Sequence, residues 1–170
     1  MGDDHADRMF DPKEIFYKET GGPMVPSRGS KGAAGWDLYA SKETELIAYQ
    51  PTLVPTDLEI AIPKGHMLLV LPRSGNSLKK QIIIPNSPGL IDSDYRGHLQ
   101  VILTWIPFVG HYENGTGLKD EYGRDQQMII TKGDRIAQAV LVPYVEQIWT
   151  PVKKLPKTER GSGGFGSTGV

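Results

Sequence analysis

Arginines that stand beside glycine in short, turn-like segments are the residues best suited to bind phosphate. They are Arg73 in Pro72-Arg73-Ser74-Gly75, Arg135 in Gly133-Asp134-Arg135, and Arg160 at the start of a glycine-rich segment. Such guanidinium groups can neutralise much of a triphosphate, because arginine donates paired N–H groups to phosphate oxygens. Each segment alone is more typical of a routine turn. Together they predict a local anion site, and Ser74 stands where a helix N-terminus would add N–H donors.

Asp92 is the candidate general base. It follows the apolar run Gly89-Leu90-Ile91, so we expect it at the end of a strand rather than in a solvated acidic cluster. A carboxylate held at such a position can take a proton from an attacking water. The alternative is an aspartate that only caps its own turn through the backbone.

The glycine-rich segment near the C-terminus has two interpretations. Residues 161–166 match the spacing G-x-G-x-x-G, but the strand-turn-helix context of a dinucleotide fold is not predicted around them. Glycines still let backbone N–H groups converge on phosphate oxygens, and Ser167 and Thr168 add hydroxyl donors. Phe165 could lie over a base. On composition alone, a disordered glycine tail is an equally good interpretation.

Composition excludes several other kinds of chemistry. The chain has no cysteine, so disulfides and thiolate catalysis are excluded, and its four histidines lack the spacing of zinc ligands. Any metal is therefore expected to be Mg²⁺ that arrives with phosphates, without direct protein ligands. A net charge of −1 with interspersed signs argues against nucleic acid or a membrane as partner. Without a signal-like N-terminus, the expected location is the cytoplasm, the nucleus of a eukaryote, or the host cytoplasm for a phage protein.

Short β-strands must position these residues. With Gly 20 and Pro 13 in 170 residues, the apolar segments are short and β-branched, which predicts an all-β sandwich or jelly roll. One short helix is predicted between Ser74 and Lys80, capped by the serine. Strands are predicted at 14–18, 36–41, 53–62, 67–71, 81–85, 98–106, 128–131, 136–144 and 147–152.

The chain is expected to form one domain at 13–150, preceded by a flexible leader at 1–12. The segment 107–127 is polar and glycine-rich, which predicts an elaborated loop inserted in that domain. Residues 151–170 have little to bury and are expected to form a mobile arm. An extended arm of about 20 residues can reach about 60 Å, far enough to lie across a neighbouring subunit.

In order along the chain, five segments resemble the motifs of the trimeric dUTPase family. They lie at 34–39, 72–75, 89–97, 133–138 and 160–169, and the third, Gly-Leu-Ile-Asp-Ser-Asp-Tyr-Arg-Gly, is the most specific. The resemblance implies a jelly-roll fold and hydrolysis of dUTP to dUMP and pyrophosphate. It also implies Mg²⁺ bridging the phosphates and active sites formed where three subunits meet. The segment 107–127 is longer than the usual connection, as in some phage-encoded members, and Trp36 replaces the more common Tyr or Phe.

The resemblance also implies roles for individual residues. Asp92 would activate the water, Tyr95 would pack under the deoxyribose, and Asn86 would help to orient uracil. Asp37 would stand near a metal and water network. The remaining implied substrate contacts are made by Gly89 and Ile91 at the uracil edge, by Arg73, Ser74, Gly75, Arg135 and Gln138 around the phosphates, and by Arg160, Phe165, Gly166, Ser167 and Thr168 in the closing arm.

Two other functions are considered. A dCTP deaminase shares the fold but needs a catalytic glutamate beside its pocket, and the sequence Leu90-Ile91-Asp92-Ser93-Asp94-Tyr95 offers none. A nucleotide-gated regulator would recruit a protein partner through the segment 107–127. A surface loop without a partner is the favoured interpretation of that segment.

Overall fold

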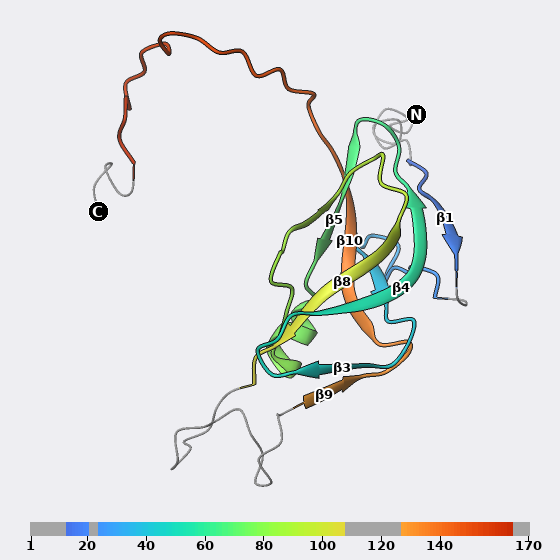
Figure 1. Cartoon of the computed structure of the whole chain (residues 1–170). Coiled ribbons are helices and arrows are strands. Elements are labelled where there is room, and N and C mark those ends of the chain that lie inside the picture. Colours follow the sequence, from blue (N-terminus) through green and yellow to red (C-terminus); the bar gives the residue numbers. More distant parts are fainter. Residues whose placement is uncertain (1–12, 21–23, 108–126, 165–170) are drawn as a thin grey trace, which may run out of the picture.

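The computed structural model describes residues 13–20, 24–107 and 127–164, and within them the chain forms a β-sandwich (Figure 1). All strand pairs are antiparallel. The first sheet has the order β1 (Phe16–Glu19), β4 (Thr52–Ala61), β8 (His98–Trp105) and β6 (Ile82–Ile83). The second has the order β2 (Trp36–Tyr39), β10 (Arg135–Pro143), β5 (His66–Leu71) and β7 (Gly89–Ile91). A smaller sheet pairs β3 (Thr44–Ile47) with β9 (Gln127–Ile130), and the predicted all-β fold is confirmed.

One core lies between the two large sheets. In β4, every second residue is buried, as expected for a strand with one face on the core. Inward side chains of the first sheet, such as Leu58 and Val101, belong to the same buried cluster as Leu38 and Ala139 of the second. Burying a large aliphatic side chain contributes roughly 1.5–3 kcal/mol, so this shared core holds the sheets together.

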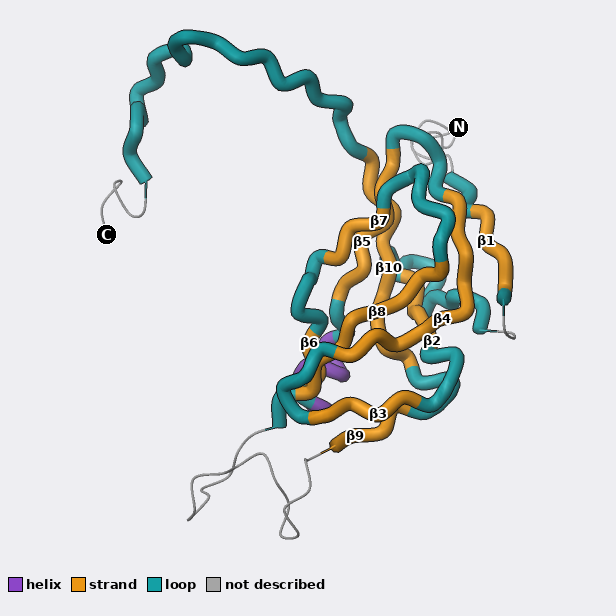
Figure 2. Tube along the Cα trace, in the orientation of Figure 1, coloured by secondary structure: helices purple, strands orange, loops and turns teal. Residues whose placement is uncertain are grey.

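The predicted helix is confirmed between Ser74 and Lys80, the helical segment of Figure 2. Its last turns form η2 (Asn76–Lys80), which ends at Gln81 in the left-handed region with φ 58°. The predicted serine cap is wrong, because no side chain caps the helix. The amides of Asn76 and Ser77 both donate to the carbonyl of Arg73 instead, at 3.0 Å. Those two N–H groups are therefore used within the turn that follows Arg73.

The predicted strand at 147–152 is wrong. The chain leaves the sheet after Pro143 and continues as an extended arm from Tyr144, which runs away from the sandwich (Figure 1). Ile148 and Trp149 are 91% and 90% exposed. Apolar residues alone do not make a strand, since a strand also needs a partner for its backbone groups. Conversely, β3 was not predicted, and β7 was predicted only as the apolar run before Asp92.

Two residues with left-handed backbone brace the chain where the segment 107–127 departs. Tyr49, with φ 63°, donates its backbone N–H to the carbonyl of Trp105 and its hydroxyl to that of Pro107, both at 2.8 Å. The carbonyl of Gln81 accepts the N–H of Ile106 at 2.9 Å. Residues 108–126 themselves lie outside the described part of the chain. Within the described part, no helix is long and apolar enough to cross a membrane.

Candidate active site

A pocket of about 450 Å³ opens beside β2, β10 and the turn before the helix. We call it the arginine pocket. It brings together residues that lie more than a hundred positions apart in the sequence, from Gly29 to Val140. Its walls include the predicted site residues Asp37, Arg73, Ser74, Gly75, Arg135 and Gln138, together with the loop residues Gly29, Ala33, Ala34 and Gly35 and the aliphatic Leu71 and Val140.

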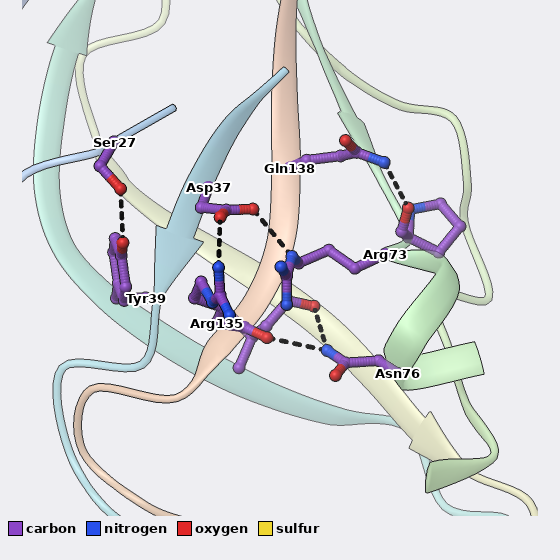
Figure 3. A network of polar contacts seen from close by, with 9 residues as sticks. Ser27, Asp37, Tyr39, Arg73, Asn76, Arg135 and Gln138 are labelled. Atoms are coloured by element: carbon purple, nitrogen blue, oxygen red, sulfur yellow. Dashed lines mark hydrogen bonds and ion pairs between the residues drawn. The ribbon is translucent and has the colours of Figure 1, made fainter. Parts of the chain in front are cut away.

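The carboxylate of Asp37 joins the two arginines of the pocket (Figure 3). Nε of Arg73 donates to Oδ1 at 2.8 Å, and Nη1 of Arg135 donates to Oδ2 at 3.3 Å. The side chain of Asp37 is only 12% exposed, whereas that of Arg135 is 52% exposed. A partly solvated ion pair adds little net stability, so the main effect of these bonds is to fix the direction of both guanidinium groups. The expected metal and water role of Asp37 stays a prediction, because its described partners are arginines.

Gln138 and Gly35 form another wall of the pocket. Nε2 of Gln138 donates to the carbonyl of Pro72 at 2.9 Å, which fixes the side-chain amide next to the Arg73 turn. A Cβ at Gly35 would lie 2.6 Å from Oε1 of the same amide. Glycine at this position therefore leaves the space that the Gln138 side chain occupies.

Sequence reasoning missed one residue of this region, Asn76. It is buried behind the pocket, and its side-chain amide donates to the carbonyl of Arg135 at 2.8 Å (Figure 3). No local pattern could reveal this contact, since the two residues are 59 positions apart. The only signal was its place directly after the Arg73-Ser74-Gly75 turn.

Asp92 follows β7 at its end, as predicted from the apolar run before it, in an exposed connection that leads to β8 of the other large sheet. We call residues 86–98 the Asp92 hairpin, although β7 and β8 do not pair with each other. The hairpin is held by its own backbone and by Arg96. The N–H of Tyr95 donates to the carbonyl of Asp92 at 3.2 Å. Nη1 of Arg96 donates to the carbonyls of Ser93 and Tyr95 at 2.8 and 2.7 Å. Within the described part of the chain, no ion pair or side-chain hydrogen bond engages the Asp92 carboxylate, so it is free to meet water.

Tyr95 folds back over the end of the hairpin. Its hydroxyl donates to the carbonyl of His98 at 2.9 Å. A Cβ at Gly97 would lie 2.5 Å from that hydroxyl oxygen and 2.8 Å from Cζ, so only glycine allows this ring position. At the other end of the hairpin, the amide of Asn86 lies close against Gly89. The structure thus gathers Asn86, Gly89, Ile91, Asp92 and Tyr95 around one hairpin.

The hairpin and the arginine pocket lie at opposite ends of β5. In the pairing of β5 with β7, Leu68 faces Ile91 and Val70 faces Gly89. Asp92 therefore stands at the level of Met67, whereas Arg73 follows the other end of the strand. Six residues separate these levels (73 − 67), or about 20 Å at roughly 3.3 Å per residue. Asp92 is accordingly not a wall of the arginine pocket in its own chain.

The arm carries the remaining predicted residues. Arg160 donates from Nε to the carbonyl of Gly163 at 2.8 Å, in a local turn where Gly161 has φ 56°. It does not line the arginine pocket. Phe165, Gly166, Ser167 and Thr168 lie outside the described residues. In the described ranges, no group of three or more His, Asp or Glu side chains could hold a metal ion.

Comparisons with known proteins agree with this arrangement. The dUTPase family model matches residues 23–105 and 123–169, and leaves unmatched most of the segment predicted as an insertion. The chain is 44% identical over 152 residues to a deoxyuridine 5'-triphosphate nucleotidohydrolase of Dinoroseobacter shibae, covering 85% of this chain and 87% of the relative. It is 39% identical to the enzyme of the same name from Treponema denticola, covering 92% of this chain and 99% of the relative.

Solved structures give the same result. A Staphylococcus bacteriophage 80alpha dUTPase with dUpNHpp has a TM-score of 0.72 at 26% identity, covering 92% of this chain and 99% of the other. The dUTPase from Streptococcus mutans has a TM-score of 0.61 at 28% identity, covering 74% of this chain and 90% of the other. With the ordered motifs, the jelly-roll fold and these relatives in agreement, the chain belongs to the dUTPase family.

Proposed function

We propose that this chain hydrolyses dUTP to dUMP and pyrophosphate. Family membership supports the proposal, as do relatives named deoxyuridine 5'-triphosphate nucleotidohydrolase at 38–44% identity. Among the structural neighbours, phage enzymes carry the dUTP analogue dUpNHpp. The deaminase alternative is not favoured, because none of these relatives bears that name and residues 92–97, directly after β7, include no glutamate.

In the proposed reaction, the carboxylate of Asp92 takes a proton from a water that attacks the α-phosphorus. A bond forms between the water oxygen and that phosphorus, and the bond to the bridging oxygen of pyrophosphate breaks. The exposed, unpaired state of the carboxylate supports its role as base. Arg73 and Arg135 would stabilise the charge that develops on the leaving pyrophosphate, since phosphoryl transfer depends mainly on positioning and charge stabilisation.

The separation of about 20 Å between the Asp92 hairpin and the arginine pocket along β5 carries the second part of the proposal. A triphosphate cannot bridge both within one chain, so we infer that each active site combines the hairpin of one copy with the pocket of another. A homotrimer meets this need. The outer face of the first sheet supports association, because Leu53 of β4 is 57% exposed and pairs in register with Ile102 of β8. The arm from Tyr144 onward would reach a further copy, and its last residues would close the site.

Magnesium fits this site only if the substrate carries it. The one carboxylate in the arginine pocket, that of Asp37, already binds two guanidinium groups. The residues that would hold the metal's phosphate ligands are therefore Arg73, Arg135 and Gln138. When bound, Mg²⁺ would neutralise phosphate charge and help to fix the conformation of the triphosphate. A related dUTPase from phage phi11 carries a structural Mg(II) ion, which is a property of that protein.

Two earlier inferences stay predictions. A protein partner for the segment 107–127 finds no supporting observation, and most of that segment lies outside the described residues. A cytoplasmic location is likewise a prediction, which fractionation of the source cells would test.

Deleting residues 108–126 tests whether this segment is accessory, and the variant should keep the turnover of the full chain. Loss of turnover in that variant would contradict an accessory role.

A pyrophosphate-release assay tests the proposed function. We expect release from dUTP with Mg²⁺ and very little from dCTP, dTTP or UTP. Ammonia from dCTP, or equal rates with all four nucleotides, would overturn the proposal. Sedimentation equilibrium tests the assembly separately: a mass of three chains supports the shared site, whereas an active monomer contradicts it.

A further inference from the structure

We propose that Asn76 is a positioning residue that sets the spacing of the two arginines in the arginine pocket. The proposal rests on the proposed function, because it assigns to Asn76 an indirect role in binding the phosphate chain. The observation behind it is a closed ring of four residues, Asp37, Arg73, Asn76 and Arg135 (Figure 3).

The ring is closed on two sides by different groups. On the pocket side, the Asp37 carboxylate joins the guanidinium groups of Arg73 and Arg135. On the buried side, Asn76 joins the backbones of the same two residues. Its own N–H donates to the carbonyl of Arg73 at 3.0 Å, and its side-chain amide donates to the carbonyl of Arg135 at 2.8 Å. Each arginine is therefore fixed at both its backbone and its side chain.

The backbone at Arg135 needs such a donor. The pairing of β10 with β2 shifts in register here, so that Arg135 faces Tyr39 while Ala137 faces Leu38. The extra residue, Ile136, forms a bulge, and a bulge interrupts the regular ladder of hydrogen bonds. The Asn76 amide supplies the carbonyls of Arg135 and Ile136 at 2.8 and 3.4 Å. The bulge that aims Arg135 into the pocket is thus capped by a residue of η2.

Burial makes this contact matter. Asn76 is 9% exposed, so water cannot replace its amide if it is removed. The bond to the carbonyl of Ile136 is buried and the bond to that of Arg135 is part-buried. A carbonyl left without its donor in such surroundings is costly, and the local backbone shifts to find another. Such a shift would move Arg135 relative to Arg73. Catalytic and binding groups are sensitive to displacements of about 1 Å, so the effect should appear in phosphate binding.

The test uses Asn76→Leu, which keeps similar volume but has no donor. We expect the KM for dUTP and the Kd for inorganic pyrophosphate, measured by titration calorimetry, to rise about tenfold, the equivalent of one lost charge-positioning hydrogen bond. In an Arg135→Ala background, the same substitution should add no more than about a twofold loss, because its effect passes through Arg135.

The matched control is Thr56→Val. Thr56 is also buried, and its hydroxyl donates to the carbonyl of Leu99 at 2.6 Å in the other sheet. Thr56→Val should lower the melting temperature by about as much as Asn76→Leu does. It should leave the KM for dUTP and the affinity for pyrophosphate unchanged.

A normal KM in Asn76→Leu, or full additivity with Arg135→Ala, would overturn the positioning role. If Asn76→Leu does not fold, Asn76→Ser avoids the apolar branched side chain and is judged by the same two outcomes. Pyrophosphate binding separates this inference from the proposed function. A wild-type chain that binds pyrophosphate but does not hydrolyse dUTP would refute the function alone.

Discussion

The arginine pocket and the Asp92 hairpin are built in opposite ways. The pocket is joined by side chains that are 36, 59 and 98 positions apart. In the hairpin, β7 pairs with β5, but the turn that carries Asp92 is held by contacts that span one to three positions. The pocket is therefore rigid and complete in one chain, whereas the hairpin is a local unit that presents an exposed carboxylate. In the proposed assembly, the fold of one chain would organise phosphate binding, and a second copy would bring the Asp92 carboxylate to it.

Removing the base should have the largest effect. Asp92→Asn keeps the hairpin and the nucleotide contacts but cannot accept the proton, so kcat should fall by about 10²- to 10⁴-fold with KM little changed. Pyrophosphate release measures kcat, and binding of dUpNHpp measures the retained affinity. The neighbouring Asp94→Asn is the comparison and should lose far less. Comparable turnover in Asp92→Asn and the wild type would remove Asp92 from the mechanism.

Removing the end of the arm tests whether the arginine pocket and the Asp92 hairpin are sufficient for turnover without it. A chain that ends at Glu159 should lose turnover on the order of 100-fold, because the substrate would no longer be enclosed. Its melting temperature should not change, since Arg160 makes its described bond within the arm itself. A normal rate together with unchanged melting would show that the arm does not close the site.

A substitution in the arginine pocket should have an intermediate effect on kcat/KM. Arg73→Lys keeps the positive charge but loses the Nε bond to Asp37, so kcat/KM should fall about tenfold, as for one charge-assisted hydrogen bond. Lys64→Arg, in an exposed turn before the opposite end of β5, serves as the control. If Arg73→Lys were fully active, charge alone would explain the pocket and the fixed direction of the guanidinium would not matter.

A substitution in the Asp92 hairpin at a residue other than Asp92 should have the smallest effect on catalysis. In Gly97→Ala, the new methyl group displaces the Tyr95 ring, so the preference for dUTP over UTP should fall by about threefold while the fold persists. The preference is the ratio of the two kcat/KM values. Gly32→Ala, where a Cβ meets nothing within 4 Å, is the matched control. An unchanged preference would mean that the ring position does not contribute to sugar selection.

The same contrast explains what could be predicted from the sequence. The position of Asp92 at the end of a strand was predicted correctly, because the apolar run that indicates it is contiguous with Asp92. Arg73, Ser74 and Arg135 were predicted as an anion site from their residue types and turns, whereas Asp37, Gly75 and Gln138 were predicted only through the family resemblance. The joining of the two arginines by Asp37 could not be predicted, since it depends on pairing between β2 and β10. Asn76 was missed for the same reason. The error at 147–152 has a different cause: the apolar residues are present, but no strand in the described part of the chain pairs with them.

The brace formed by Tyr49 and Gln81 determines where this chain can accept inserted residues. It fixes the chain up to Pro107, and β9 resumes at Gln127 against β3. Closing a longer loop between fixed ends costs only about 0.6 kcal/mol for each doubling of its length. Additional sequence can therefore enter at this point at a small entropic cost, without disturbing the strands that carry the arginine pocket.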